Sequence, residues 1–236
     1  MDWSRFEFVT QRGRETGNDE QEDFLPEQVQ IRGSSCVLVL QKRGDRWVSG
    51  KIRARQNLTE LRPNGGSLEV VVQGVNSSFH RGIWPAVWLL PHGRWPQGGE
   101  IDLFEQMYFK PGDERKAFST CHFGRDRDYR GGAGLNLAHY NWDTGDQRLR
   151  FDWRREGAHW RLSMLLNGEP KWSFSTDGTG VMDVAGFNPA AVFQRCFDDP
   201  QHGLYLVCNL SYGGRPFGPV SGLELADFFI QSVTVT

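Results

Sequence analysis

Apolar residues along this chain occur in short runs, either continuous or alternating with polar residues, and few follow the period of a helix. The runs cover residues 35–43, 46–56, 66–75, 82–91, 100–107, 117–124, 147–156, 159–168, 171–176, 203–214 and 227–236. Turn sequences such as Pro63-Asn-Gly-Gly and Asn167-Gly separate them. We therefore expect about eleven to fourteen strands, arranged as an all-β antiparallel β-sandwich or jelly roll.

Two segments depart from this pattern. Residues 187–197 ("FNPAAVFQRCF") predict one or two helical turns, with Asn188 as a cap and Pro189 opening the helix. Residues 124–147 are polar and glycine-rich without a period, which is typical of a loop at the rim of a site or of a solvated surface loop. Neither a linker nor an internal repeat divides the chain, so we expect a single domain over residues 1–236.

The stretch "GGEIDLFEQM" (98–107) places three carboxylates in one predicted strand. In regular alternation Glu100 and Asp102 share a face, while Glu105 points into the packed layer, where a lone carboxylate is costly. A β-bulge at Leu103–Phe104 would return Glu105 to the face of the other two. An exposed acidic strand is the alternative interpretation.

A row of three carboxylates has a use in glycoside hydrolysis, where two carboxyl groups flank the sugar. Like charges that lie close together raise one another's pKa, which keeps an acid protonated near neutral pH. In this interpretation Glu100 is the nucleophile, Glu105 is the acid/base and Asp102 supports the nucleophile. No cofactor is required for this chemistry.

Composition narrows the range of partners and locations. The chain has 27 basic and 29 acidic residues, so its charge of −2 gives no reason to expect nucleic acid or an anionic membrane as a partner. The N-terminal sequence lacks the features of a signal peptide, so the protein is either cytoplasmic or a mature fragment with an added Met. Aromatic residues make up 13% of the chain, with nine tryptophans, as in a large core or a carbohydrate-binding groove.

Four cysteines (Cys36, Cys121, Cys196 and Cys208) lie far apart without a CxxC pair. This spacing disfavours a zinc site. It leaves open either one or two disulfides or small buried thiols. Acceptor triplets for glycosylation at Asn57 and Asn76 slightly favour secretion.

Residues 82–107 ("GIWPAVWLLPHGRWPQGGEIDLFEQM") resemble the signature of glycoside hydrolase family 16, in the form found in laminarinase-like endo-β-1,3-glucanases. The resemblance extends to "GNDEQEDFLPEQVQI", "WVSGKIRAR", "STCHFG" and "LYLVCNLSYGG". It implies a concanavalin-like jelly roll with a concave substrate cleft and retaining, endo-acting cleavage of a β-1,3-glucan or a mixed β-1,3/1,4-glucan. It also implies a secreted monomer whose partner is the polysaccharide.

Several alternatives remain open within and outside this family. Agarose or carrageenan could be the glycan, and Arg94, Arg125, Arg127 and Arg130 could then contact sulfate groups. Transglycosylation uses the same residues. A lectin-like binding module would need the tryptophans but not the carboxylates.

The resemblance and the strand parity together suggest substrate-binding residues. Trp95 would stack on a sugar next to the cleavage point, because a pyranose face packs well against an indole. His122 is expected near Glu105, where it would contact the acid/base or a sugar hydroxyl. The remaining candidates are Trp84, Trp88, Asn209, Asn18 and Arg53.

The family resemblance also suggests a structural calcium ion on the convex face. Asp227 in the last strand is the matching acidic residue, and Glu7 is a second candidate. Because calcium takes 6–8 oxygen ligands, two carboxylates alone do not define such a site.

Overall fold

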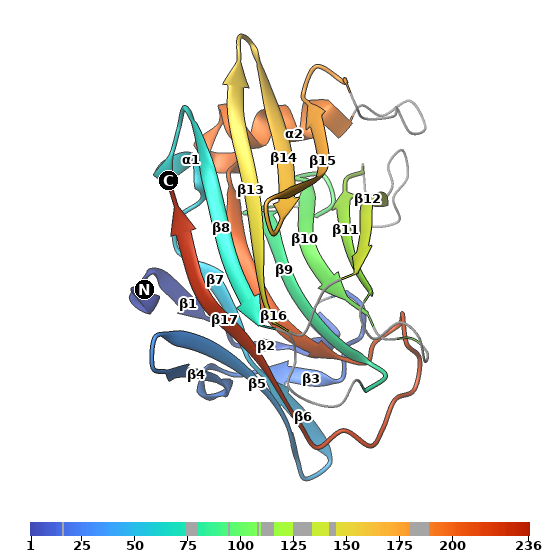
Figure 1. The fold of residues 1–236 in the computed structure, drawn as a ribbon. Helices are drawn as coiled ribbons and strands as arrows, with labels where there is room; N and C mark the ends of the chain where they lie inside the picture. The colour runs from blue at the N-terminus through green and yellow to red at the C-terminus, as the bar shows by residue number, and fades with distance from the viewer. Residues whose placement is uncertain are drawn as a thin grey trace.

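The computed structural model describes residues 1–15, 17–73, 80–93, 95–107, 109, 116–124, 134–141, 145–179 and 189–236. Most of them form two sheets that pack face to face (Figure 1). Among the described residues, all strand pairs are antiparallel except the short parallel pair of residues 22–24 with residues 47–49. The predicted antiparallel β-sandwich of the jelly-roll type is therefore confirmed.

One sheet has seven strands and carries the three carboxylates. Its spatial order is β1 (Phe6–Phe8), β7 (Lys51–Ala54), β16 (Leu204–Tyr212), β9 (Ile83–Pro91), β10 (Glu100–Gln106), β11 (Lys116–His122) and β12 (Gly134–Asn141).

The second sheet has ten strands. Nine of them lie in the order β15 (Glu169–Ser175), β14 (His159–Leu166), β13 (Asp146–Glu156), β8 (Gly65–Gln73), β17 (Leu225–Val235), β5 (Ser35–Arg43), β6 (Arg46–Ser49), β3 (Glu22–Phe24) and β2 (Gln11–Arg12), and β4 (Val29–Arg32) pairs with β5.

Six short helical segments connect these strands within the described part of the chain. They are the α-helices α1 (Leu58–Leu61) and α2 (Pro189–Asp198) and the 3₁₀ turns η1 (Trp3–Arg5), η2 (Gly13–Glu15), η3 (Pro26–Gln28) and η4 (Pro200–His202). Helix α2 covers one end of the sandwich, beside α1 and β14 (Figure 1). None of the helices within the described ranges is long and apolar enough to cross a membrane.

Alternating side chains build the core between the sheets. In β13, Leu149, Phe151 and Trp153 are buried, while Arg150 between them is exposed and Asp152 is half-buried. Phe151 stacks on Trp153 and also contacts Trp172 and Phe197, which comes from α2. Aromatic side chains from the ten-stranded sheet and from α2 therefore share one core, as the high tryptophan content suggests.

The structure corrects parts of the predicted secondary structure. Seventeen strands are present in the described residues, because strands of two to four residues at the N-terminal end are too short to produce a pattern. Strand β12 lies inside the predicted 124–147 loop, where pairing with β11 supplies the ladder that periodicity did not indicate. Helix α2 is longer than the one or two turns predicted, and its proposed cap Asn188 lies outside the described residues.

The four cysteines are free and buried. Of the two alternatives, the structure therefore has buried thiols rather than disulfides. Burial raises the pKa of Cys36 and of Cys196 to about 12 in each case, which keeps both thiols protonated and unreactive.

Candidate active site

Strand β10 contains the predicted bulge. Its pairing with β11 shifts between Asp102 and Glu105, so that Leu103 and Phe104 together oppose Ser119. The pairing of β10 with β9 shifts at the same place. Leu103 and Phe104 are both fully buried in the core, as two residues on the inner side of a bulge should be.

The bulge aligns the three carboxylates on the outer face of the seven-stranded sheet, the face turned away from the ten-stranded sheet. Ile101 between the first two carboxylates is fully buried in the core, and the two bulge residues face inward with it. The row on the outer face consists of Glu100, Asp102 and Glu105. The sequence-based prediction of this row is confirmed.

Glu105 is held by a tryptophan from the neighbouring strand β9. Trp84 Nε1 donates a hydrogen bond to Glu105 Oε1 at 2.9 Å, and the Glu105 residue is only 9% exposed. Burial and the charge of Asp102 raise the pKa of Glu105 to about 8, although the Trp84 bond opposes this shift. Phe217 packs edge-on against the Trp84 ring and limits its movement.

Glu100 and Asp102 form a close group with His122 from β11. His122 Nε2 lies 3.1 Å from Asp102 Oδ2 and 3.9 Å from Glu100 Oε1. Burial raises the pKa of both carboxyls well above the ordinary values, and the charge of Asp102 raises that of Glu100 further. These three residues are the one group of three or more candidate metal ligands within the described ranges, with ligand atoms within 4.8 Å of one another.

The position of His122 corrects one sequence-based expectation. We expected it beside Glu105, but the strand register pairs it with Glu100, whereas Glu105 pairs with Phe118. The register of β11 depends on the bulge, which the motif "STCHFG" does not specify. His122 still acts on Glu105 electrostatically by lowering its pKa.

Trp95 lies in the turn before β10 and contacts the same group. Its side chain donates a hydrogen bond to Glu100, which partly offsets the upward shift of the Glu100 pKa. Its ring centroid lies 6.3 Å from that of His122. Trp95 is half-buried, so part of its surface is accessible beside the carboxylates.

Trp88 and Asn209 lie on the same outer face, next to the carboxylates. Trp88 pairs with Asp102 across the β9–β10 ladder, and its Nε1 donates to Asn209 Oδ1 at 2.7 Å. Asn209 Nδ2 donates to Ser211 Oγ at 2.9 Å. The parity argument that directed Asn209 away from the Leu/Cys face of β16 is confirmed, because Cys208 is in the core.

Sequence reasoning missed a charged group that extends the outer face beyond Trp88. Lys51 Nζ lies 5.3 Å from the centre of the Trp88 ring and donates to Gln11 Oε1 at 2.9 Å. Burial lowers the pKa of Lys51 to about 8, while the charges of Glu20 and Glu22 raise it. The sequence did contain a clue to the position of Lys51. Lys51 and Arg53 are two residues apart in the strand segment "SGKIRAR", so their side chains lie on the same face of the sheet.

The two glutamates beside Lys51 are themselves buried. Burial raises the pKa of Glu22 to about 8, and its Oε2 accepts a hydrogen bond from the Tyr212 backbone N–H at 2.9 Å. Burial also raises the pKa of Glu20, although a hydrogen bond from the Asn18 side chain opposes the shift. The contact that the structure gives for the Asn18 side chain is therefore with Glu20 of this charged group.

Arg53 and the two proposed calcium ligands are engaged in ion pairs. Arg53 Nη2 lies 2.5 Å from Glu7 Oε2, on the outer face of the seven-stranded sheet. Asp227 Oδ2 lies 2.5 Å from Arg32 Nη1, in the ten-stranded sheet. Glu7 and Asp227 thus belong to different sheets and each contacts a guanidinium, an arrangement that does not fit a shared calcium site. The calcium ion stays a prediction without a ligand set.

The arginines proposed to contact a sulfated glycan lie outside the described residues. They are Arg94, Arg125, Arg127 and Arg130.

The arrangement supports acid–base chemistry on a sugar. Glu105 is protonated near neutral pH, while Glu100 lies on the same row and receives a hydrogen bond from Trp95. Two carboxyls with different environments can act as acid and nucleophile at one glycosidic bond. Fold and site together define this chain as a jelly-roll domain with a row of three carboxylates on the outer face of one sheet.

Comparisons with known proteins agree with this class. A family model described as "XgeA-like, catalytic GH16 domain" matches residues 68–125, which include all three carboxylates. Glucan endo-1,3-beta-glucosidase from Cryptopygus antarcticus is 26% identical over 143 residues, covering 58% of this chain and 47% of that protein. Beta-1,3-glucan-binding protein from Penaeus monodon is 27% identical over 191 residues, covering 66% of this chain and 49% of that protein.

The fold has close structural counterparts. The crystal structure of an endo-1,3-beta-glucanase from Streptomyces sioyaensis superposes with a TM-score of 0.74 at 18% identity, covering 100% of this chain and 90% of that chain. The chain is thus similar to glycoside hydrolase family 16 over the segment that carries the three carboxylates. It spans about half the length of the two curated relatives.

Proposed function

We propose that this chain is the catalytic domain of a retaining endo-glycosidase that cleaves β-1,3-glucan or mixed β-1,3/1,4-glucan. The observation that carries the proposal is the row Glu100–Asp102–Glu105, aligned by the bulge and held by Trp84 and Trp95. The choice of glucan is supported by the relatives named for β-1,3-glucan. Action outside the cell is part of the proposal, because a polysaccharide is too large to cross a membrane unaided.

In the first step, the Glu100 carboxylate attacks the anomeric carbon and forms a glycosyl ester. The glycosidic C–O bond breaks, and the leaving oxygen takes the proton of Glu105. In the second step, Glu105 removes a proton from water, and the resulting hydroxide attacks the same carbon. The ester bond to Glu100 breaks, so one water molecule is consumed for each bond cleaved.

The nucleophile must be ionised although burial raises its pKa. The close carboxyls cannot all carry a charge, so one proton resides on the Glu100–Asp102 pair. Trp95 and His122 both stabilise charge on Glu100, whereas burial is the main influence on Asp102. We infer that Glu100 and Asp102 share this proton, and that Glu100 is the charged member of the pair at the moment of attack.

A panel of polysaccharides tests the function. Laminarin, lichenan, agarose and carrageenan are incubated with the protein, and new reducing ends are measured, with Glu105→Gln as the matched inactive control. We expect release from laminarin or lichenan, with oligosaccharides as early products. Release from agarose or carrageenan alone would contradict the choice of glucan.

The second candidate function is glucan binding without cleavage. One specific observation favours it, the similarity to a relative named as a β-1,3-glucan-binding protein. The complete carboxylate row argues against it, because binding alone has no use for a buried protonated carboxyl. Retention of the protein on insoluble laminarin without release of reducing ends would favour this candidate.

Transglycosylation uses the same residues and is the remaining variant of the proposal. Addition of an acceptor oligosaccharide distinguishes it, since longer products would then appear at the expense of hydrolysis.

A further inference from the structure

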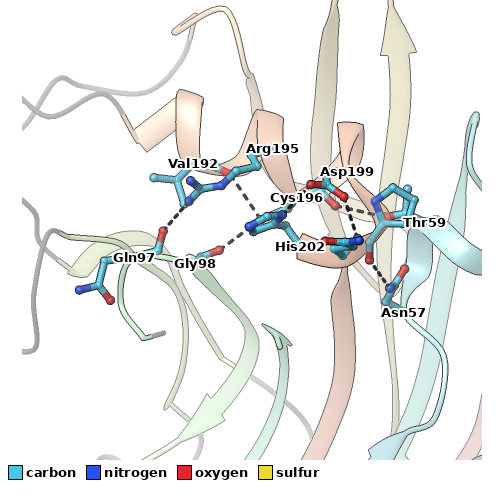
Figure 2. A network of polar contacts seen from close by, with 11 residues as sticks. Asn57, Thr59, Gln97, Gly98, Val192, Arg195, Cys196, Asp199 and His202 are labelled. Carbon is cyan, nitrogen blue, oxygen red and sulfur yellow. Dashed lines mark hydrogen bonds and ion pairs between the residues drawn. The ribbon is translucent and has the colours of Figure 1, made fainter. Parts of the chain in front are cut away.

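Helix α2 donates two hydrogen bonds to the turn that connects Trp95 to the strand of Glu100 (Figure 2). Arg195 Nη2 donates to the carbonyl oxygen of Gln97 at 2.9 Å. The neighbouring Cys196 Sγ lies 3.2 Å from the carbonyl oxygen of Gly98. Two successive carbonyls of the turn are therefore bonded to two successive residues of α2.

The thiol has a second acceptor inside the helix. Cys196 Sγ also lies 3.4 Å from the carbonyl oxygen of Val192, one turn earlier in α2. The contact to Gly98 is the shorter of the two and the one that leaves the helix. Because burial raises the pKa of Cys196 to about 12, the thiol keeps the proton that it donates.

The turn itself fits closely against the apolar side of α2. The Gly99 N–H donates to the carbonyl oxygen of Pro96 at 3.0 Å, which closes the turn. Gly99 has φ of +78°, and a Cβ at this position would lie 2.9 Å from atoms of both Val192 and Phe193. Only glycine fits there, so the backbone approaches α2 as closely as it can.

Helix α2 is fixed to the rest of the sandwich on its other side. Thr59 Oγ1 donates to the carbonyl oxygen of Cys196 at 3.1 Å, and Asn57 Nδ2 donates to the carbonyl oxygen of Pro200 at 2.8 Å (Figure 2). Trp160 Nε1 donates to Asp198 Oδ1 at 2.9 Å. The helix is therefore a rigid support for the turn rather than a loose cover.

We propose that Arg195 and Cys196 are positioning residues that hold the 96–99 turn so that Trp95 and Glu100 face the same sugar. They act through the carbonyls of Gln97 and Gly98 and do not touch the substrate. The inference rests on the proposed function, in which Trp95 stacks on the sugar that Glu100 attacks. A small displacement of the turn would move both groups together, and catalysis is sensitive to displacements of about 1 Å.

Arg195→Ala is the informative variant because Arg195 is exposed on the surface of α2. Its loss removes the bond to Gln97 and leaves the buried face of the helix unchanged. We expect kcat/KM on laminarin oligosaccharides to fall by about tenfold, since misplacement of this kind costs catalysis. Arg195→Lys keeps a donor for the Gln97 carbonyl and should recover most of the loss.

The matched control is Arg148→Ala. Arg148 is also exposed and ion-paired, to Glu69 at 2.5 Å, but it lies on β13 of the other sheet. Its removal should leave kcat/KM at the wild-type value. A double-mutant cycle of Arg195→Ala with Trp95→Phe should be non-additive, because Arg195 acts through the position of Trp95.

A readout that needs no activity separates this inference from the proposed function. The protein is labelled with 5-fluorotryptophan, and the ¹⁹F resonance of Trp95 is assigned by its loss in Trp95→Phe. We expect this resonance to shift or broaden in Arg195→Ala and to stay in place in Arg148→Ala.

Each result decides one of the two proposals. A Trp95 resonance that does not move in Arg195→Ala overturns the inference, as does unchanged kcat/KM in an active enzyme. If the wild-type protein cleaves no glycan, the proposed function is wrong, and the turn then has no catalytic role. A displaced Trp95 resonance in that protein would still establish that α2 holds the turn.

Discussion

Trp84 and Glu105 come from neighbouring strands and meet through a single hydrogen bond of 2.9 Å between the indole N–H and the carboxyl oxygen. The bond favours the ionised carboxylate, whereas burial and the charge of Asp102 favour the protonated form. Burial and charge prevail, and the pKa of Glu105 is raised to about 8. Trp84 thus limits how far the pKa of the proposed acid rises.

Trp84→Phe should shift the alkaline limb of the pH profile upward. Without the indole N–H the pKa of Glu105 rises above about 8, so the acid keeps its proton to higher pH. The pH dependence of kcat/KM on laminarin oligosaccharides measures this limb in the free enzyme. An alkaline limb that moves to lower pH would contradict the assignment of Glu105 as the group that Trp84 controls.

Glu100→Ala and Glu105→Ala should each lower kcat by at least about 10²-fold, the usual minimum for removing a group that takes part in proton transfer or bond formation. Asp102→Asn should lower it less, because Asp102 supports the nucleophile without touching the anomeric carbon. Reducing-end assays measure the loss, and circular dichroism checks that each variant is folded. Turnover at the wild-type rate in a folded Glu100→Ala or Glu105→Ala protein would disprove the site.

Hydrolysis should retain the anomeric configuration, because the proposed reaction inverts the anomeric carbon twice. ¹H NMR of fresh products should show the β-anomer first and the α-anomer only after mutarotation. Early appearance of the α-anomer would require a single displacement by water and a wider separation of the two carboxyl groups.

Glu22→Gln should stabilise the protein at pH 8 and make its stability less dependent on pH. Burial raises the pKa of Glu22 from 4.5 to about 8, so the folded protein binds more protons than the unfolded chain between these values. Wild-type stability therefore falls as pH rises through this window, and the variant lacks this loss. The amide oxygen can still accept the hydrogen bond from the Tyr212 N–H.

Urea unfolding at pH 5, 7 and 8 measures the effect. Glu224→Gln is the matched control, since Glu224 is exposed. A free-energy difference between wild type and Glu22→Gln that stays constant over the three pH values would show that Glu22 does not titrate in this range.

The sequence alone was sufficient wherever a feature is local. Alternation predicted the strands of the sandwich, and the spacing of Glu100, Asp102 and Glu105 predicted the bulge, because both depend on the geometry of a single strand. Trp95 lies five positions before Glu100, so its place beside the carboxylates also followed from the chain. The short N-terminal strands were not predicted because strands of two to four residues are too short to show a pattern. Strand β12 was not predicted because it forms by pairing with β11, although its sequence does not alternate.

Tertiary structure decided the features that depend on strand order, register and burial. Which carboxylate His122 faces depends on the register between β10 and β11. The contact of Lys51 with Trp88, and the bonds from Arg195 and Cys196 to the 96–99 turn, join segments far apart in the chain. The pKa of Glu105 is set mainly by removal of the carboxyl from water, and only the packed fold determines how completely that happens.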